Sequence, residues 1–198
     1  MSLKISYSFL APVYDLIAGP TFRTARRDSL AALPREPRGT VLINGVGSGL
    51  DFQFLPRGHR YVGLDLTRAM LARSVRRATR HEFFPVLGNS LALPFREACF
   101  DHAVLHLILA VVPDAGRALA ETARVVRPGG SILVFDKFLK PNQRAPLRRL
   151  LNPLEERLFS RLDVVLDEVV PRVPGLRVLS DEPAAASGWF RRLLLERT

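Results

Sequence analysis

The sequence is poor in cysteine and lacks long apolar runs. Its single cysteine, Cys99, cannot form a disulfide within the chain, and with only four scattered histidines it does not predict a zinc site. This usage fits a reducing compartment, so we expect a cytoplasmic protein without a bound metal. No stretch approaches the ~20 apolar residues of a membrane-spanning helix. The N-terminus also lacks the apolar core and cleavage site of a signal peptide.

Negative charge is scarce as well. Against 29 Lys and Arg there are 19 Asp and Glu, which gives a formal net charge of +10. This excess predicts an acidic partner, either nucleic acid or an anionic membrane surface, although a basic surface retained for solubility would look the same. Aromatic residues make up 8% of the chain and form no base-stacking pattern, which disfavours nucleic acid. A position at the inner face of the membrane is the alternative to a purely cytoplasmic one.

Strand-like and helix-like segments alternate through the first two thirds of the chain. Apolar runs predict five strands, at residues 40–44, 60–65, 83–87, 102–109 and 131–135. Apolar residues at helical spacing predict two helices, at residues 67–79 and 114–126. This order implies a doubly wound parallel sheet with helices on both faces and right-handed crossovers.

The last third differs in character. Residues 143–162 combine leucines at helical spacing with interleaved arginines. Such a segment could lie on an anionic membrane, or its leucines could pack on the sheet while the arginines stay solvated. Residues 163–173 could add a helical turn or two. Two final strands are expected at 176–180 and 188–196, as a hairpin with a long loop.

The stretch VLINGVGSGLD, residues 41–51, places three glycines at alternate positions after a strand. A glycine loop between a strand and a helix lets a ligand approach the backbone. The spacing G-x-G-x-G differs from the dinucleotide fingerprint G-x-G-x-x-G, and neither the hydrolase elbow nor the phosphate loop is present. Asp65 ends the next predicted strand, where a carboxylate can accept both hydroxyls of a ribose. It could instead help to cap the helix that starts near Thr67.

Five stretches together are similar to the class I S-adenosylmethionine-dependent methyltransferases: VLINGVGSG, YVGLDLTRAMLARS, LGNSLALPF, FDHAVLHLILAVVPD and RVVRPGGSILV. The resemblance covers residues 40–135. It implies a Rossmann-like α/β sheet of seven strands, mostly parallel with an antiparallel last strand, and S-adenosyl-L-methionine as cofactor. Within the family, FLAPVYDLIAGPTF and the glycine loop look most like small soluble bacterial phosphatidylethanolamine N-methyltransferases. Quinone methyltransferases share a similar Tyr-Asp stretch.

The resemblance also implies a cofactor site. Its glycines would line the methionine part, Asp65 would hold the ribose, and Asn89 would accept a hydrogen bond from the adenine amino group. The full set is Tyr7, Gly45, Gly47, Gly49, Asp65, Leu66, Met70, Asn89, Ser90, Leu91 and His106. Tyr14 and His106 are the catalytic candidates, because an amine acceptor must lose a proton before attack. Met70 and His106 could instead be core residues, and Tyr14 could anchor the N-terminal helix.

One position departs from the family pattern. The residue two before the first glycine is usually an acid that positions the cofactor's ammonium-bearing part, and here it is Ile43. Its loss could cost roughly one charge-assisted hydrogen bond, about 1.5–3 kcal/mol. Asn44 is adjacent, but on a strand its side chain should point to the opposite face.

We therefore expect one domain over residues 1–198, with an N-terminal helical lid (1–35), a cofactor-binding core (36–136) and substrate-side helices with the last two strands (137–198). The expected activity is methyl transfer to a phospholipid or lipid-like amine at the membrane surface. A quinone or other small-molecule methyltransferase is the first alternative. Nucleic-acid methylation and a degenerate, non-catalytic binding module are the others.

Overall fold

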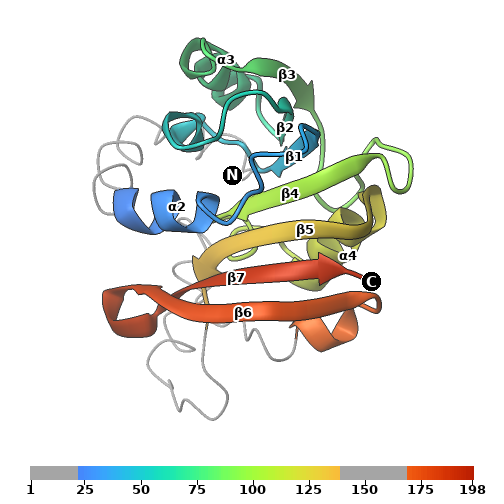
Figure 1. Cartoon of the computed structure of the whole chain (residues 1–198). Coiled ribbons are helices and arrows are strands. Elements are labelled where there is room, and N and C mark those ends of the chain that lie inside the picture. Colours follow the sequence, from blue (N-terminus) through green and yellow to red (C-terminus); the bar gives the residue numbers. More distant parts are fainter. Residues whose placement is uncertain (1–21, 139–168) are drawn as a thin grey trace.

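A computed structural model describes residues 22–138 and 169–198 (Figure 1). Its centre is a seven-stranded sheet in the order β3-β2-β1-β4-β5-β7-β6. The strands are β1 (Thr40–Asn44), β2 (Arg60–Asp65), β3 (Glu82–Leu87), β4 (Phe100–His106), β5 (Val126–Lys137), β6 (Leu176–Ala185) and β7 (Phe190–Arg197). The first five pair in parallel, whereas β7 is antiparallel to both of its neighbours. The predicted sheet, mostly parallel with an antiparallel last strand, is confirmed.

Helices pack on both faces of this sheet. The α-helices are α2 (Arg23–Leu30), α3 (Arg68–Arg77) and α4 (Ala115–Val125), and the short 3-10 helices are η1 (Leu50–Gln53), η2 (Val170–Arg172) and η3 (Ala186–Gly188). On one face, α2, η1 and α3 cover a buried apolar cluster that contains Val41 and Ile43. On the other face, α4 and η2 cover a second cluster that contains Leu42. Successive side chains of β1 therefore point to opposite faces of the sheet. Because both faces are buried, the strand carries a continuous run of apolar residues.

Several predicted boundaries were wrong, each for a local reason. β4 was expected to reach residue 109 but ends at His106, because Leu107 takes a positive φ of 58° that no strand can continue. After the glycine loop the chain forms only the 3-10 turn η1, since in a longer helix Pro56 would clash with the carbonyl four residues earlier. The long loop expected between the last strands is only η3, because β6 extends to Ala185.

Candidate functional site

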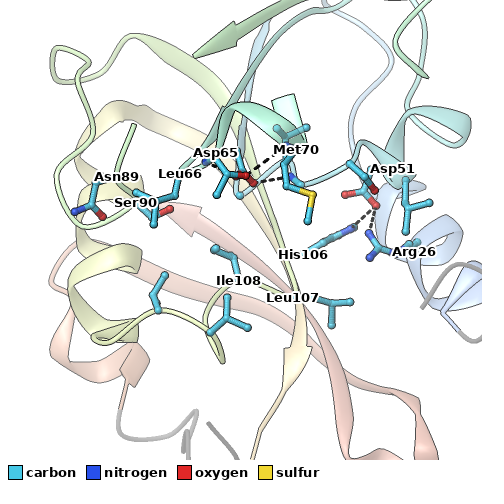
Figure 2. A pocket seen from close by; sticks show the side chains of 18 of the residues that line it. Arg26, Asp51, Asp65, Leu66, Met70, Asn89, Ser90, His106, Leu107 and Ile108 are labelled. Atoms are coloured by element: carbon cyan, nitrogen blue, oxygen red, sulfur yellow. Dashed lines mark hydrogen bonds and ion pairs between the residues drawn. The ribbon is translucent and has the colours of Figure 1, made fainter. Parts of the chain in front are cut away.

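A cavity of about 220 Å³ opens at the carboxyl ends of β1, β2 and β4 (Figure 2). Its walls come from the glycine loop and η1, the loop after β2 with the start of α3, residues 89–90, and the segment after β4. Because parallel strands end at the same edge, residues far apart in the sequence meet there. Helix α2 adds Arg26 to this wall.

The glycine loop is tied directly to the end of β2. The Gly47 N–H donates to Asp65 Oδ2 at 3.0 Å, and the Thr67 N–H donates to Oδ1 at 2.9 Å. Thr67 Oγ1 also donates to Oδ1, while accepting from the Met70 N–H as the N-cap of α3. Burial raises the pKa of Asp65, and these hydrogen bonds oppose the rise. Of these hydrogen bonds, only the one from Gly47 goes to Oδ2, so this oxygen can also accept from a ligand hydroxyl. Asp65 thus supports the helix start and also faces the cavity.

Glycine is needed at positions 47 and 49 of the loop for two different structural reasons. A Cβ at Gly47, where φ is +54°, would meet no atom within 4 Å and would extend into open space. A Cβ at Gly49, where φ is +83°, would lie 2.9 Å from Cα of Ser74 in α3. Gly47 therefore keeps the cavity open beside the backbone, whereas Gly49 allows the loop to pack against α3.

A buried polar network forms the opposite wall of the cavity (Figure 2). Asp51 Oδ1 accepts from Arg26 Nη1 at 2.6 Å and lies 3.0 Å from His106 Nδ1. His106 Nε2 lies 3.0 Å from Ser29 Oγ. Burial alone would raise the pKa of Asp51. The charges and hydrogen bonds of His106 and Arg26 lower this pKa by more than burial raises it, so it lies well below its usual range. Asp51 is therefore a buried, ionised carboxylate.

The network also sets the histidine's hydrogen-bonding roles. A carboxylate can only accept, so His106 Nδ1 carries the proton in this contact. Oδ2 of Asp51 accepts no hydrogen bond from any residue in the described part of the chain, which leaves it for a ligand cation or donor.

The side chain of Ile43 does not take part in this wall. Ile43 is buried in the apolar cluster under α2, η1 and α3. Asn44 points the other way, as expected: its Nδ2 donates to Thr122 Oγ1 of α4 at 3.0 Å, and its Oδ1 accepts from Ser90 Oγ at 2.6 Å. Neither residue supplies a carboxylate at the end of β1.

The segment after β4 closes the cavity with mainly apolar side chains: Leu107, Ile108, Val111, Val112 and Pro113. Asp136 of β5 holds this segment from behind, because its Oδ2 accepts from the Ala110 N–H at 3.2 Å. Burial raises the pKa of Asp136 to about 6, although hydrogen bonds from the Lys137 and Ala110 backbone oppose the rise.

Most of the predicted site residues meet at this cavity. Its lining includes Gly45, Gly47, Asp65, Leu66, Met70, Asn89, Ser90 and His106. Gly49 and Leu91 lie outside this lining, and Tyr7 and Tyr14 lie outside the described residues. Asn89 Oδ1 accepts from the Leu91 N–H at 2.9 Å, so this oxygen already has one donor.

Sequence reasoning missed Arg26 and Asp51 at the cavity, and Ser29 behind His106. Asp51 had a usable signal, since it is an acid two residues after the last glycine of the loop. Arg26 and Ser29 had none. They come from α2, which reaches the site only through the tertiary fold.

Comparison with known proteins agrees with this geometry. Residues 42–134 match the family model described as a methyltransferase domain. A phosphatidylethanolamine N-methyltransferase from Cereibacter sphaeroides is 28% identical over 190 residues, which cover 93% of each chain. Over this domain the chain is similar to the class I S-adenosylmethionine-dependent methyltransferases. It is a methyltransferase, and its cofactor is S-adenosyl-L-methionine.

Other methyltransferases match over smaller parts. The ubiquinone/menaquinone biosynthesis C-methyltransferase UbiE from Paracoccus denitrificans (strain Pd 1222) is 34% identical over 131 residues, 62% of this chain and 52% of that enzyme. The chain therefore spans about half the length of this quinone enzyme. Geranyl diphosphate C-methyltransferase from Streptomyces coelicolor A3(2), solved with S-adenosyl-L-homocysteine, aligns with a TM-score of 0.72 at 16% identity, over 89% of this chain and 79% of that one. This last likeness shows the shared fold.

The cavity suits the cofactor on two counts. Two carboxylates, Asp51 and Asp65, and one guanidinium, Arg26, line it. A ligand with a sulfonium, an ammonium and a carboxylate carries one excess positive charge, which matches this balance. The open space beside Gly47 is a cradle that a Cβ would fill.

The described residues show no group of three or more side chains that could hold a metal ion. Within the same residues, no helix is long and apolar enough to cross a bilayer.

Proposed function

We propose that this methyltransferase N-methylates a phospholipid or lipid-like amine at the membrane surface by direct in-line transfer. The observation that carries the proposal is the match to the Cereibacter sphaeroides phosphatidylethanolamine N-methyltransferase, which extends over 93% of both chains. The quinone enzyme matches over 62% of this chain and 52% of its own length. A match over nearly the whole of both chains bears on the acceptor, because a shared cofactor domain accounts for cofactor binding only.

The side chains that line the cavity suggest how the cofactor is oriented. Leu66, Met70 and Asn89 would take the adenine, beside Asp65, whose Oδ2 would also accept from a ribose hydroxyl. At the opposite wall, Asp51 Oδ2 would receive the ammonium and Arg26 the carboxylate of the amino-acid end. An ion pair on the wall of a cavity is complementary to a zwitterion, so these two residues would replace the acid that is missing at Ile43.

When bound, S-adenosylmethionine supplies an electrophilic methyl group whose sulfur leaves with the bonding electrons. The protein's main contribution is to align the acceptor nitrogen with this methyl group and to exclude water. The apolar segment after β4, which forms one wall of the cavity, suits both tasks. The acceptor nitrogen must be neutral when its new bond to carbon forms, so its proton leaves before attack.

The prediction that His106 accepts this proton stays a prediction, as does the one for Tyr14. Both ring nitrogens of His106 lie within hydrogen-bond distance of protein partners, Asp51 and Ser29. This geometry favours His106 as a positioning residue that orients Asp51. A His106→Gln variant separates the two roles: a base would lower kcat with a changed pH profile, whereas a positioning residue would mainly raise the Kd for the cofactor.

We also propose the division of the chain into a lid (1–35), a cofactor core (36–136) and a substrate side (137–198). Helix α2 supports the first part, because Arg26 and Ser29 bring it to the cofactor wall. The basic segment 143–162, which would contact the membrane, lies outside the described residues. The net charge of +10 supports a position at an anionic surface.

The test is methyl transfer with S-adenosylmethionine labelled in its methyl group. Vesicles of phosphatidylethanolamine and phosphatidylglycerol are incubated with the full chain, and the lipids are separated and identified by mass spectrometry. We expect label in mono-, di- or trimethylated phosphatidylethanolamine, and none with the Gly47→Ala variant, whose Cβ would occupy the space beside the loop where the cofactor would lie. Label absent from lipid, while S-adenosylhomocysteine still binds, would overturn the lipid acceptor but not the family.

A quinone acceptor is the second candidate, because quinone C-methyltransferases match this chain at 34% identity. A demethylated menaquinone in detergent micelles is therefore assayed in parallel with the vesicles. Transfer to the quinone at a kcat/KM at least about tenfold above that for the lipid would select this alternative.

A further inference from the structure

A second cavity, of about 440 Å³, adjoins the cofactor cavity, with Leu50 in the wall of both. One side comes from η1 and the chain that follows it, and the other from the C-terminal end of α3 and the turn into β3. These two segments pack against each other in the fold. The methyl-transfer reaction described above uses no side chain of this cavity other than Leu50.

The lining of this second cavity is strongly basic. It contains Arg57, Arg77, Arg80 and His81, and no Asp or Glu. The guanidinium groups of Arg57, Arg77 and Arg80 are charged at all relevant pH values, and an anion between them would relieve the part of their repulsion that solvent does not screen at these exposed positions. Their planar, forked donors match the arrangement of oxygens on a phosphate group better than they match a spherical halide ion.

His81 adds a second, independent observation. Its Nε2 lies 3.2 Å from the Leu55 carbonyl, which can only accept, so Nε2 carries a proton. Its Nδ1 is buried and has no hydrogen-bond partner in the described part of the chain. A buried nitrogen without a partner is uncommon, and in this tautomer Nδ1 is an acceptor that the P–OH of a hydrogenphosphate group would satisfy.

The cavity is also connected to the cofactor loop. Arg77 Nη1 donates to the carbonyl oxygen of Ser48 at 2.8 Å, and Ser48 lines the cofactor cavity. An anion that binds Arg77 therefore lies one side chain away from the loop that holds the cofactor.

We propose that this second cavity is a binding site for a phosphate group, carried either by a lipid headgroup or by a free phosphate compound. Arg57 and Arg80 would hold the anion from opposite segments, with Arg77 and His81 between them. An ordinary solvated basic surface would give the same net charge but no preference for these positions. The proposal does not depend on the identity of the methyl acceptor.

The test uses inorganic phosphate as the probe, titrated into the full chain at pH 7.5 by calorimetry, with chloride at equal ionic strength as the reference. The variant Arg57→Glu/Arg80→Glu removes two of the anion's donors. The matched control, Arg68→Glu/Arg76→Glu, changes the net charge by the same amount, but its two residues lie in α3 outside the cavity lining. Arg77 is left intact because it holds the Ser48 carbonyl. We expect the first variant to lose at least about tenfold in phosphate affinity, and the control less than about twofold.

S-adenosylhomocysteine binding is measured on all three proteins as a check of folding, and we expect it to be preserved. Vesicles of phosphatidylcholine with and without phosphatidic acid then separate the sources. Sedimentation that requires phosphatidic acid and is lost in Arg57→Glu/Arg80→Glu supports a lipid headgroup. Phosphate binding without such sedimentation supports a free phosphate compound. Equal losses in both variants, or no phosphate binding at 10 mM, would overturn the site.

Discussion

Replacing Asp51 by asparagine removes one charge from the buried wall of the cofactor cavity and leaves the shape nearly unchanged. In the structure, Oδ1 accepts from Arg26 and His106, whereas Oδ2 accepts from no described residue. The side chains of Arg26 and Asp51 are each only 6% exposed, so solvent does not screen their interaction. The substitution therefore acts on stability through Oδ1 and on the cofactor through Oδ2.

The two effects differ in size. Breaking a buried ion pair by removing one partner costs about 3–5 kcal/mol, because the buried guanidinium of Arg26 loses the carboxylate charge 2.6 Å away. Losing one charge-assisted hydrogen bond to the ammonium costs about 1.5–3 kcal/mol, which weakens S-adenosylhomocysteine binding by about tenfold to a hundredfold. Stability is measured by urea unfolding, and affinity by calorimetry at a temperature where both proteins are folded.

The double variant Arg26→Met/Asp51→Asn separates the two effects. It removes both charges, while the asparagine oxygen can still accept from His106 Nδ1. We expect it to recover most of the lost stability but none of the lost affinity. The control is Ile43→Val, a packing change of about 0.5–1.5 kcal/mol that should leave the Kd unchanged. An Asp51→Asn protein with wild-type affinity, or a double variant that regains it, would refute the role given to Asp51.

Three further changes test other parts of the site. Gly47→Ala should lose only about 1–2 kcal/mol of folding stability for its positive φ, yet it should fail to bind S-adenosylhomocysteine in calorimetry. Gly49→Ala should mainly lower the midpoint of urea unfolding, because its Cβ would lie 2.9 Å from α3. Asp65→Asn should weaken the same ligand by at least about tenfold, and unchanged affinity would contradict the ribose contact. The pKa of Asp136 is raised from 3.8 to about 6, so the native state holds its proton longer and stability should fall by about 3 kcal/mol as pH rises through this window. Urea unfolding between pH 4 and 7 should show this fall in the wild type and its absence in Asp136→Asn; parallel curves would rule it out.

The parallel arrangement of the first five strands could be predicted because these strands carry a two-sided apolar pattern. Val41, Leu42 and Ile43 are all buried, and such runs between helical repeats have few other solutions than a parallel sheet with helices on both faces. The ends of elements were harder to predict. Where β4 stops depends on the positive φ of Leu107, and nothing in the apolar run 102–109 indicates it.

The cofactor edge could be predicted for a similar reason. Gly47 follows β1, and Asp65 is the last residue of the adjacent strand β2. Their contact is therefore a consequence of the sheet topology. The opposite wall could not be predicted, because Arg26 and Ser29 reach it from α2 through contacts with residues 25 and 77 positions away. Such pairings depend on how a helix packs on the finished sheet, which no local pattern encodes.

The missing acid at Ile43 in β1 can be explained by the position of Asp51 in η1. An acid at position 43 would enter an apolar cluster of described residues that includes Phe52 and Val104. Asp51 is equally buried, but Arg26 and His106 hold its pKa low, so it stays ionised at the cavity wall. The Asp51–Arg26 pair offers a ligand both a hydrogen-bond acceptor and a donor. A single acid at the end of β1 would offer only an acceptor. If the Asp51–Arg26 pair binds the zwitterionic end of the cofactor, Ile43 is free to pack the core, and the altered motif does not imply weak binding.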